Sequence, residues 1–316
     1  MKIAHFPNLD LNLLKVFDAL MEERSVTRAG ERLGLTQSAV SHALNRLRAA
    51  LGDELFLRTV DGMRPTPWAI DAGPKVARAL GQMQRALAPT SFHPLDSDRR
   101  FALGMLPYLS AVMAPRLVRS FHEQAPLAEL VVRHSERDVA EALDTGRLDV
   151  ALGSFGRSPD RFDRRPLFQE RLVWVVRKSH ILAGGPLTLE ALAEQAHLTI
   201  SSRDGRSVDQ GLERRVIWDD EGAYMSAMAR TGRKQPAGMS APDSLTALAI
   251  AAQTDLMTLA PLRMAEMFRD AFSLAILEPP YDTRPIDVMA LWRKDQTDHP
   301  AIGWLVELLV RESAQI

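Results

Sequence analysis

The sequence predicts an α+β multidomain protein: a winged helix-turn-helix, a linker helix, and a two-lobed α/β region. Three observations predict this. Capped helices fill the start of the chain, a hairpin signal follows them, and strands alternate with helices from residue 101 onward. The 316 residues exceed one ordinary domain, and a hydrophobic content of 46% suffices for more than one core.

Two helices open the chain. The apolar stripe of the first consists of Leu13, Val16, Phe17 and Leu20, which recur at helical spacing. Ser25 then caps a short helix over residues 26–33, and Gly34, just past its end, suits a left-handed C-cap. Gly34 thus ends this second helix just before a tight turn.

A third helix begins after Thr36, which suits its N-cap. Its buried row is Val40, Leu44, Leu47 and Leu51, at steps of four, three and four. The opposite face is polar and uncharged, with Gln37, Ser41 and Asn45 on one row and Ser38 and His42 on the next. A short turn followed by a helix with a hydrogen-bonding face predicts a DNA-binding helix-turn-helix.

A hairpin and a long helix follow. Residues 55–59 predict a strand, Asp61-Gly62 a turn, and Met63-Arg64 the returning strand. Such a hairpin is a wing, in which Arg58 and Arg64 would lie beside the phosphate backbone. Thr66-Pro67 then starts the linker helix. Its apolar seam, which indicates packing against a partner helix in a dimer, is Ala69, Gly73, Val76, Leu80, Met83 and Leu87.

At these residues the chain resembles a known family. The run "SVTRAGERLGLTQSAVSHALNRLRAALGDELFLRTVDGMRPTP", residues 25–67, closely resembles the amino-terminal domain of LysR-type transcriptional regulators. The resemblance implies DNA contacts by Gln37, Ser38, Ser41, His42 and Arg58. The full set of candidate DNA-binding residues is Ser25, Thr27, Thr36, Gln37, Ser38, Ser41, His42, Asn45, Arg46, Arg58 and Arg64. Many members carry proline at Ser38 and arginine at His42, so the base preference does not carry over.

Beyond Pro89 and Pro94 the pattern becomes α/β. The first block of expected strands and helices covers residues 101–105, 111–122, 129–133, 137–143 and 148–153. The second covers 172–176, 189–194, 198–200 and 256–261, and the chain returns with a strand over 285–293 and a helix over 301–311. This alternation predicts parallel sheets with helices on both faces.

The two blocks resemble the periplasmic-binding-protein-like effector domain of the same family, with "GRLDVALG", "VVRKSH" and "LWRKD...HPAIGWLVELL" in comparable places. The expected domains are a DNA-binding domain (1–65), a linker helix for dimerisation (66–90) and an effector domain (97–316). In the effector domain, lobe I covers about 97–168 and 278–316, and lobe II about 169–277. The resemblance further implies pairing of dimers into a homotetramer and contacts with RNA polymerase.

Ligands of doubly wound sheets settle at the carboxyl ends of strands. The residues expected there, as candidate effector-binding residues, are Leu106, Tyr108, Ser110, Ser154, Ser201, Ser202 and Ser240. Hydroxyls and free amides at helix starts accept anions, which favours a small carboxylated or aromatic effector. The alternative is that these serines only cap helices. The charged 203–207 segment is either a solvated surface loop, or Arg203 or Arg206 closes over the bound effector.

Composition limits the other classes of function. The net charge is −1, but residues 24–64 carry seven arginines against four acidic side chains. No cysteine is present, which suits a cytoplasmic protein, and neither a signal peptide nor a membrane-spanning run is readable.

No catalytic, metal-binding or cofactor motif is expected either. The "LGSFG" segment lacks the first glycine of a nucleophile elbow, and the eight histidines show no pair at ligand spacing. The alternatives left are a solute-binding protein, a DNA-binding protein without an effector, and an enzyme fused to a DNA-binding domain.

Overall fold

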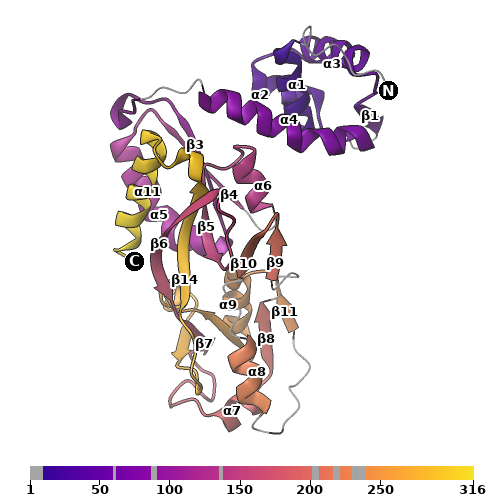
Figure 1. Cartoon of the computed structure of the whole chain (residues 1–316). Helices are drawn as coiled ribbons and strands as arrows, with labels where there is room; N and C mark the ends of the chain where they lie inside the picture. Colours follow the sequence, from indigo (N-terminus) through magenta and orange to yellow (C-terminus); the bar gives the residue numbers. More distant parts are fainter. Residues whose placement is uncertain are drawn as a thin grey trace. The chain divides into compact units, whose positions relative to one another are not determined.

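The structure, a computed structural model of the 316-residue chain, describes residues 10–59, 62–86, 91–134, 138–200, 206–215, 221–229, 232 and 239–316. The chain divides into two compact units that meet in sequence at residues 89 and 90. Figure 1 traces both units. In the described parts of the chain, no helix has the length and apolar character that crossing a membrane requires.

The first unit is a winged helix-turn-helix followed by a long helix. Its elements are α1 (Leu11–Glu23), α2 (Val26–Leu33), α3 (Gln37–Leu51), β1 (Phe56–Thr59), β2 (Gly62–Pro65) and α4 (Pro67–Ala86). One core joins all of them, and its buried members include Phe17, Leu20, Val40, Leu47 and Phe56. The element order and the buried faces of α1 and α3 confirm the sequence prediction, except that Leu51 is only half-buried.

The caps are those that the sequence predicts. Ser25 accepts a hydrogen bond from the Arg28 amide at 3.4 Å, and Thr36 accepts one from the Ala39 amide at 3.2 Å. Gly34 ends α2 with a left-handed backbone, at φ 65°. Side-chain oxygens thereby satisfy amide donors that a helix start leaves without partners, which fixes where each helix begins.

Gly30 sets how closely α2 approaches the turn into α3. A Cβ atom at this position would lie 2.7 Å from the carbonyl oxygen of Leu35, a backbone atom that has little room to move. The Leu35 amide in turn donates to the Gly30 carbonyl at 2.8 Å. The tight turn of the motif therefore depends on a residue without a side chain here.

The linker helix α4 uses part of its apolar seam within its own unit. Ala69 is fully buried, and both Ala69 and Val76 belong to the unit's core. The side chain of Met21 on α1 occupies the space beside Gly73, where a Cβ atom would approach its Cε to 2.6 Å. The prediction that the whole seam packs on a partner helix is thus wrong for its first half, because α1 already covers it. Leu87 lies outside the described residues.

The second unit contains two sheets, each the centre of one lobe. The first lobe is built on β3 (Arg100–Met105), β4 (Glu129–His134), β5 (Val150–Phe155), β6 (Phe162–Glu170), β9 (Arg206–Asp209), β10 (Leu212–Arg215) and β14 (Ile286–Arg293). Strands β4, β3 and β5 run parallel, as predicted, while β14 pairs antiparallel with both β5 and β6. Figure 1 shows β14 and α11, from the yellow end of the chain, beside these strands.

The second lobe contains the sheet β11-β8-β12-β7-β13. Its strands are β7 (Leu172–Arg177), β8 (His197–Ile200), β11 (Met239–Ala241), β12 (Met257–Pro261) and β13 (Leu274–Leu277). Strands β11, β8 and β12 are parallel, and β7 pairs antiparallel with both β12 and β13. Both sheets are therefore mixed, where the sequence predicted parallel ones.

The helices predicted over 111–122, 137–143, 189–194 and 301–311 are all present, and three further helices lie between the third and the fourth of them. They are α5 (Pro107–Gln124), α6 (Val139–Asp144), α7 (Leu189–Glu194), α8 (Glu221–Ala229), α9 (Ser244–Gln253), α10 (Leu262–Phe268) and α11 (Pro300–Ser313), with 3₁₀ turns at Pro94–Asp96 and Lys294–Gln296. The largest core joins both lobes, because α5 contacts α11 of the first lobe and α9 and α10 of the second.

One segment differs from the predicted division into lobes. The hairpin β9–β10 falls in the range expected for lobe II, yet Arg214 and Arg215 of β10 pair with Phe155 and Ser154 of β5. The hairpin thus extends the first sheet. Its short, charged strands carry little hydrophobic alternation, so sequence pattern alone does not reveal which sheet they join.

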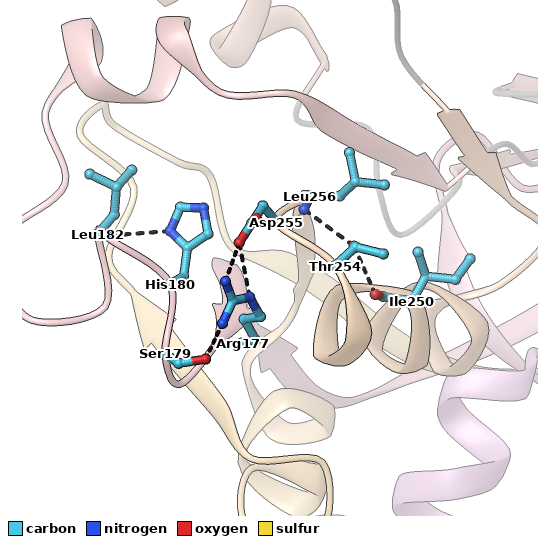
Figure 2. A network of polar contacts seen from close by, with 8 residues as sticks. All are labelled: Arg177, Ser179, His180, Leu182, Ile250, Thr254, Asp255 and Leu256. Carbon is cyan, nitrogen blue, oxygen red and sulfur yellow. Dashed lines mark hydrogen bonds and ion pairs between the residues drawn. The ribbon is translucent and has the colours of Figure 1, made fainter.

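A network of polar contacts surrounds Arg177, the last residue of β7 in the second lobe (Figure 2). Arg177 donates from Nε and Nη2 to Oδ1 of Asp255, at 2.9 and 2.6 Å, and also bonds Ser179. Thr254 donates to the carbonyl of Ile250 at 2.9 Å and so terminates α9. The network holds the turn between α9 and β12 against the end of β7.

Candidate functional site

The polar face of α3 faces solvent in this unit. Gln37, Ser38, His42 and Asn45 are exposed and Ser41 is half-buried, whereas Val40, Leu44 and Leu47 of the opposite face lie in the core. Side chains with amide, hydroxyl and imidazole groups form hydrogen bonds with base edges in a major groove. The face has the composition and the exposure that the helix-turn-helix prediction requires.

Several of these side chains are already engaged locally. Oγ of Ser38 lies 3.0 Å from Oγ1 of Thr36, and Oδ1 of Asn45 accepts a hydrogen bond from Nη1 of Arg48 at 3.2 Å. Nη2 of Arg46 lies 3.4 Å from Oδ2 of Asp10, which also caps α1. Gln37 and His42 form no side-chain hydrogen bond with any residue in the described ranges, and they are therefore the side chains most available for base contacts.

The wing presents two arginines that have no counter-charge among the described residues. Arg58 on β1 and Arg64 on β2 are both exposed and form no ion pair there. Arginines 28 and 32, by contrast, pair with glutamates 22 and 23 at the end of α1. Positive charge is thus left unneutralised on the wing, where contact with a phosphate backbone needs it.

Two residues fix the wing against α3. Arg48 donates from Nε to the carbonyl of Glu54 and from Nη2 to that of Phe56, both at 2.7 Å. Oδ1 of Asp53 accepts from the Leu55 amide and from Oγ1 of Thr66, again both at 2.7 Å. Thr66 also caps α4 by accepting from the Ala69 amide. Hydrogen bonds of the "LGDELFLR" segment and of Arg48 therefore connect α3, the wing and the start of α4.

The remaining candidates of the first unit lie at the starts of α2 and α3. Ser25 is half-buried and caps α2, while Thr27 in the first turn of the same helix is exposed. Thr36 is exposed and caps α3. Gly62, with φ 122°, brings the wing close to the α1–α2 turn, where the Met63 amide donates to the Arg24 carbonyl at 2.9 Å.

The candidate effector residues lie at different depths in the second unit. Leu106 is the N-cap residue of α5 at the end of β3, and Leu106 and Ser110 are both half-buried. Ser154 is buried within β5, which runs on to Phe155 instead of ending at Gly153, and it pairs opposite Arg215 of β10. Ser240 is exposed on β11, near the start of α9, whose N-cap is Asp243.

Tyr108 does not face solvent at all. It is 1% exposed in the core between the lobes, and its hydroxyl donates to Oε2 of Glu170, which is completely buried. Burial, followed by the nearby negative charge of Glu170, raises the pKa of Tyr108 well above its ordinary value. We therefore do not retain Tyr108 as a residue that touches an effector. The sequence predicts its position just after the first strand but not its burial.

Some candidates lie outside the described residues: Ser201, Ser202, Arg203 and Asp61. Arg206 is described only as part of the β9 backbone. Among the side chains that the structure describes, no group of three or more histidine, aspartate or glutamate residues has the arrangement of a metal site.

The sequence analysis did not identify the residues that hold other parts of the structure in position. Arg48 appeared only as one of several arginines, and Glu170 and Arg263 were not singled out. A signal for Glu170 does exist, since it is a charged residue directly before the apolar run 172–176. A fully buried carboxylate needs partners that belong to distant segments, and these cannot be read from local pattern.

Comparisons with known proteins agree with this geometry. Residues 11–69 match the family described as "Bacterial regulatory helix-turn-helix protein, lysR family", and residues 96–314 match the "LysR substrate binding domain". The two matches together cover the winged helix-turn-helix and both lobes of the second unit. Members of this family are transcriptional regulators, not enzymes.

Relatives match over nearly the whole chain. The chain is 34% identical over 306 residues to the transcriptional activator NagR of a Ralstonia species, and 33% identical over 304 residues to NahR of Pseudomonas putida, covering 96% of this chain and 97% of the relative in both cases.

Solved structures agree as well. A probable transcriptional regulator from Pseudomonas aeruginosa is 33% identical, with a TM-score of 0.73 over 96% of this chain and 97% of that one. Full-length CbnR in complex with its target DNA shares the fold at 20% identity, with a TM-score of 0.64 over 96% and 100% of the two chains. The chain belongs to the LysR family of DNA-binding, effector-responsive transcriptional regulators.

Proposed function

We propose that this regulator reads its operator with the exposed polar face of α3 and positions itself with the wing. The proposal rests on two kinds of exposed side chain in the first unit. Gln37 and His42 are exposed and form no side-chain hydrogen bond with the described residues. Arg58 and Arg64 are exposed and have no counter-charge among the described residues. Uncharged donors and acceptors suit base edges, while arginines suit phosphates. Gln37 has the amide geometry that forms paired hydrogen bonds with adenine.

The protein binds as a dimer through the exposed half of α4. Met83 is 42% exposed and Leu80 half-buried, whereas Ala69 is buried in the unit's core and Gly73 lies against Met21 of α1. An exposed apolar seam on a long helix favours a partner helix. Two recognition helices then enter successive major grooves, so the operator is partly palindromic with half-sites about one helical turn apart.

The second unit responds to a small carboxylated or aromatic effector between its lobes. α5 begins at the end of β3 with Leu106 as an N-cap residue that makes no side-chain cap hydrogen bond, and Ser110 lies in the same helix. Ser240 lies on β11, a few residues before the start of α9. Helix starts favour anions through their amides and dipole. The competing role of these serines, local capping, is already filled at α9 by Asp243.

Effector binding changes how the lobes are arranged and thereby the bending of DNA and the contacts with RNA polymerase. A ligand has this effect only through its different affinity for the two arrangements. Dimers pair into a homotetramer that acts in the cytoplasm. NagR and NahR are named as activators, which supports activation of transcription as the outcome.

A gel-shift experiment tests the DNA-binding proposal. The full chain should bind the DNA upstream of its own gene and leave an unrelated fragment of equal length unbound in competition. Sedimentation tests the dimer: Leu80→Glu with Met83→Glu should convert dimers to monomers, while Ile70→Glu, at a 58% exposed site outside the seam, should not. Equal binding to both DNA fragments, or an unchanged sedimentation profile, would contradict the respective proposal.

A thermal-shift screen tests the effector proposal. Benzoate and short aliphatic carboxylates serve as probes, and Ser110→Ala is the variant whose response should be reduced. If no carboxylate shifts the melting curve of the wild-type protein, this class of effector is wrong.

A further inference from the structure

Glu170 is a charged side chain with no exposure to solvent, at the point where the chain leaves the first lobe for the second. It ends β6, which belongs to the first sheet, and Leu172 begins β7, which belongs to the second. A carboxylate withdrawn completely from water is stable only when other groups compensate for its lost hydration. The compensating groups therefore show what this crossover depends on.

The partners of Glu170 come from both lobes. The hydroxyl of Tyr108, in the first turn of α5, donates to Oε2. Oε1 accepts the Arg171 amide at 2.9 Å and lies 3.4 Å from Nη1 of Arg263, which is on α10 of the second lobe. One carboxylate thus connects the helix that follows β3 to the helix that follows β12.

Arg263 is itself held at the crossover. Its Nη1 donates to the carbonyl of Gln169 at 2.9 Å, and its guanidinium lies 4.6 Å from the centre of the Phe168 ring. Its Nε atom, however, is buried and has no hydrogen-bond partner among the described residues. A buried donor without an acceptor destabilises the fold. A different arrangement of the lobes that gave Nε an acceptor would remove this free-energy cost.

Arg171, the residue after Glu170, forms an ion pair at the surface of the same crossover. Successive side chains of an extended strand point in opposite directions, and Arg171 accordingly reaches the surface. Its Nη2 lies 2.6 Å from Oε2 of Glu278, which follows β13 on the second connection between the lobes. Both connecting segments are therefore tied together at the level of Glu170.

We propose that Tyr108, Glu170 and Arg263 form a latch that couples the start of α5 to α10, with Tyr108 as a positioning residue for the effector response. The inference rests on the proposed function in one respect: the start of α5 is the edge where we place the effector. A ligand bound beside Leu106 and Ser110 shifts the backbone that carries Tyr108, and the shared carboxylate passes this shift to the second lobe. Such coupling is reciprocal.

Hydrogen exchange of the full chain, without ligand or DNA, tests the latch. Tyr108→Phe removes only the hydroxyl, so it should accelerate amide exchange about tenfold in the β3–α5 segment and also in the β12–α10 segment, as expected for losing a hydrogen bond to a charged group. Arg263→Lys should produce the reciprocal result, with faster exchange in β3–α5. It also serves as the second variant if Tyr108→Phe does not fold.

Tyr224→Phe is the matched control. Its hydroxyl lies 2.6 Å from Nδ1 of buried His197, and both residues belong to the second lobe. The same atomic deletion should therefore accelerate exchange in the second lobe alone. The latch is overturned if Tyr108→Phe affects only β3–α5, if neither segment changes, or if Tyr224→Phe accelerates β3–α5 equally. Absence of any carboxylate response in the thermal-shift screen would instead overturn the proposed effector, whereas the exchange experiment contains no ligand and tests the latch separately.

Discussion

Arg48 on the recognition helix donates from Nη2 to the carbonyl oxygen of Phe56 at 2.7 Å and so ties α3 to the first strand of the wing. A second bond, from Nε to the Glu54 carbonyl, gives the guanidinium a fixed orientation. The planar fork of arginine matches two backbone acceptors, and the single ammonium of lysine does not. The relative positions of helix and wing depend on this side chain.

Arg48→Lys should therefore weaken operator binding although the charge is kept. Loss of one or two bonds from a charged donor costs about 1.5–3 kcal/mol each and loosens the wing. Titration of labelled operator with the full chain measures this. Arg32→Lys is the control, since its surface pair with Glu22 contributes at most about 1 kcal/mol. Equal affinity of the Arg48 variant and the control would show that the wing is held by other contacts.

Arg58→Ala should weaken binding to specific and unrelated DNA alike. An arginine on a phosphate releases counterions, so its loss should reduce the slope of log affinity against log salt by about one per protomer. Affinities at four salt concentrations give this slope. Arg100→Ala removes an arginine of the second unit that pairs with Glu129 at 3.1 Å, and it should leave the slope unchanged. A normal slope for Arg58→Ala would remove the wing from the phosphate contacts.

Gly30→Ala should destabilise the first unit, because the added Cβ would meet the Leu35 carbonyl at 2.7 Å. Strain of this kind typically costs about 1–3 kcal/mol. Gly303→Ala provides the contrast: in α11 a Cβ at this position meets nothing within 4 Å, and alanine favours helix by up to about 1 kcal/mol. Hydrogen exchange at increasing denaturant concentration measures the stability of each unit separately and so compares the two variants. A Gly30 variant as stable as the wild type would mean that the turn can open without cost.

The first unit could be predicted almost entirely because its signals are local. Ser25, Gly34 and Thr36 mark helix ends within a few residues of the atoms they contact, and the buried row of α3 follows from spacing alone. The linker seam was only half right. An apolar row on α4 does not say whether α1 or a partner covers it, and Gly73 proved to be packed against Met21.

The second unit was less predictable because its decisive contacts are distant in sequence. The strand signals of the second block were correct to within a residue or two, but β6, β13 and the β9–β10 hairpin carry weak patterns and were not foreseen. Tyr108 was placed correctly after β3 as a candidate effector-binding residue, but its burial was not foreseen. Its partner, Glu170, lies 62 residues away and cannot be inferred from spacing.

The second lobe should lose stability as the pH falls below about 6.5, the ordinary pKa of histidine. Burial lowers the pKa of His197, which lies against Trp174 and the Tyr224 hydroxyl. The folded lobe thus binds a proton less readily than the unfolded chain. The stabilisation is complete above the unfolded pKa and declines as the pH falls towards the folded one.

Hydrogen exchange in β7 and β8, corrected for intrinsic rates, should therefore show lower protection at pH 5.5 than at pH 7.5. His197→Gln should flatten this dependence in the second lobe. If His197→Gln loses as much protection between pH 7.5 and pH 5.5 as the wild type, another group causes the pH dependence.

The central claim is that the Gln37–Asn45 face of α3 reads bases, and a binding selection from operators with a randomised half-site tests it most directly. Wild type and Gln37→Ala are compared under the same salt. We predict that the variant loses preference at one base position in each half-site, by about 1–3 kcal/mol, and keeps the others. Identical preferences in both proteins would contradict base reading by this face.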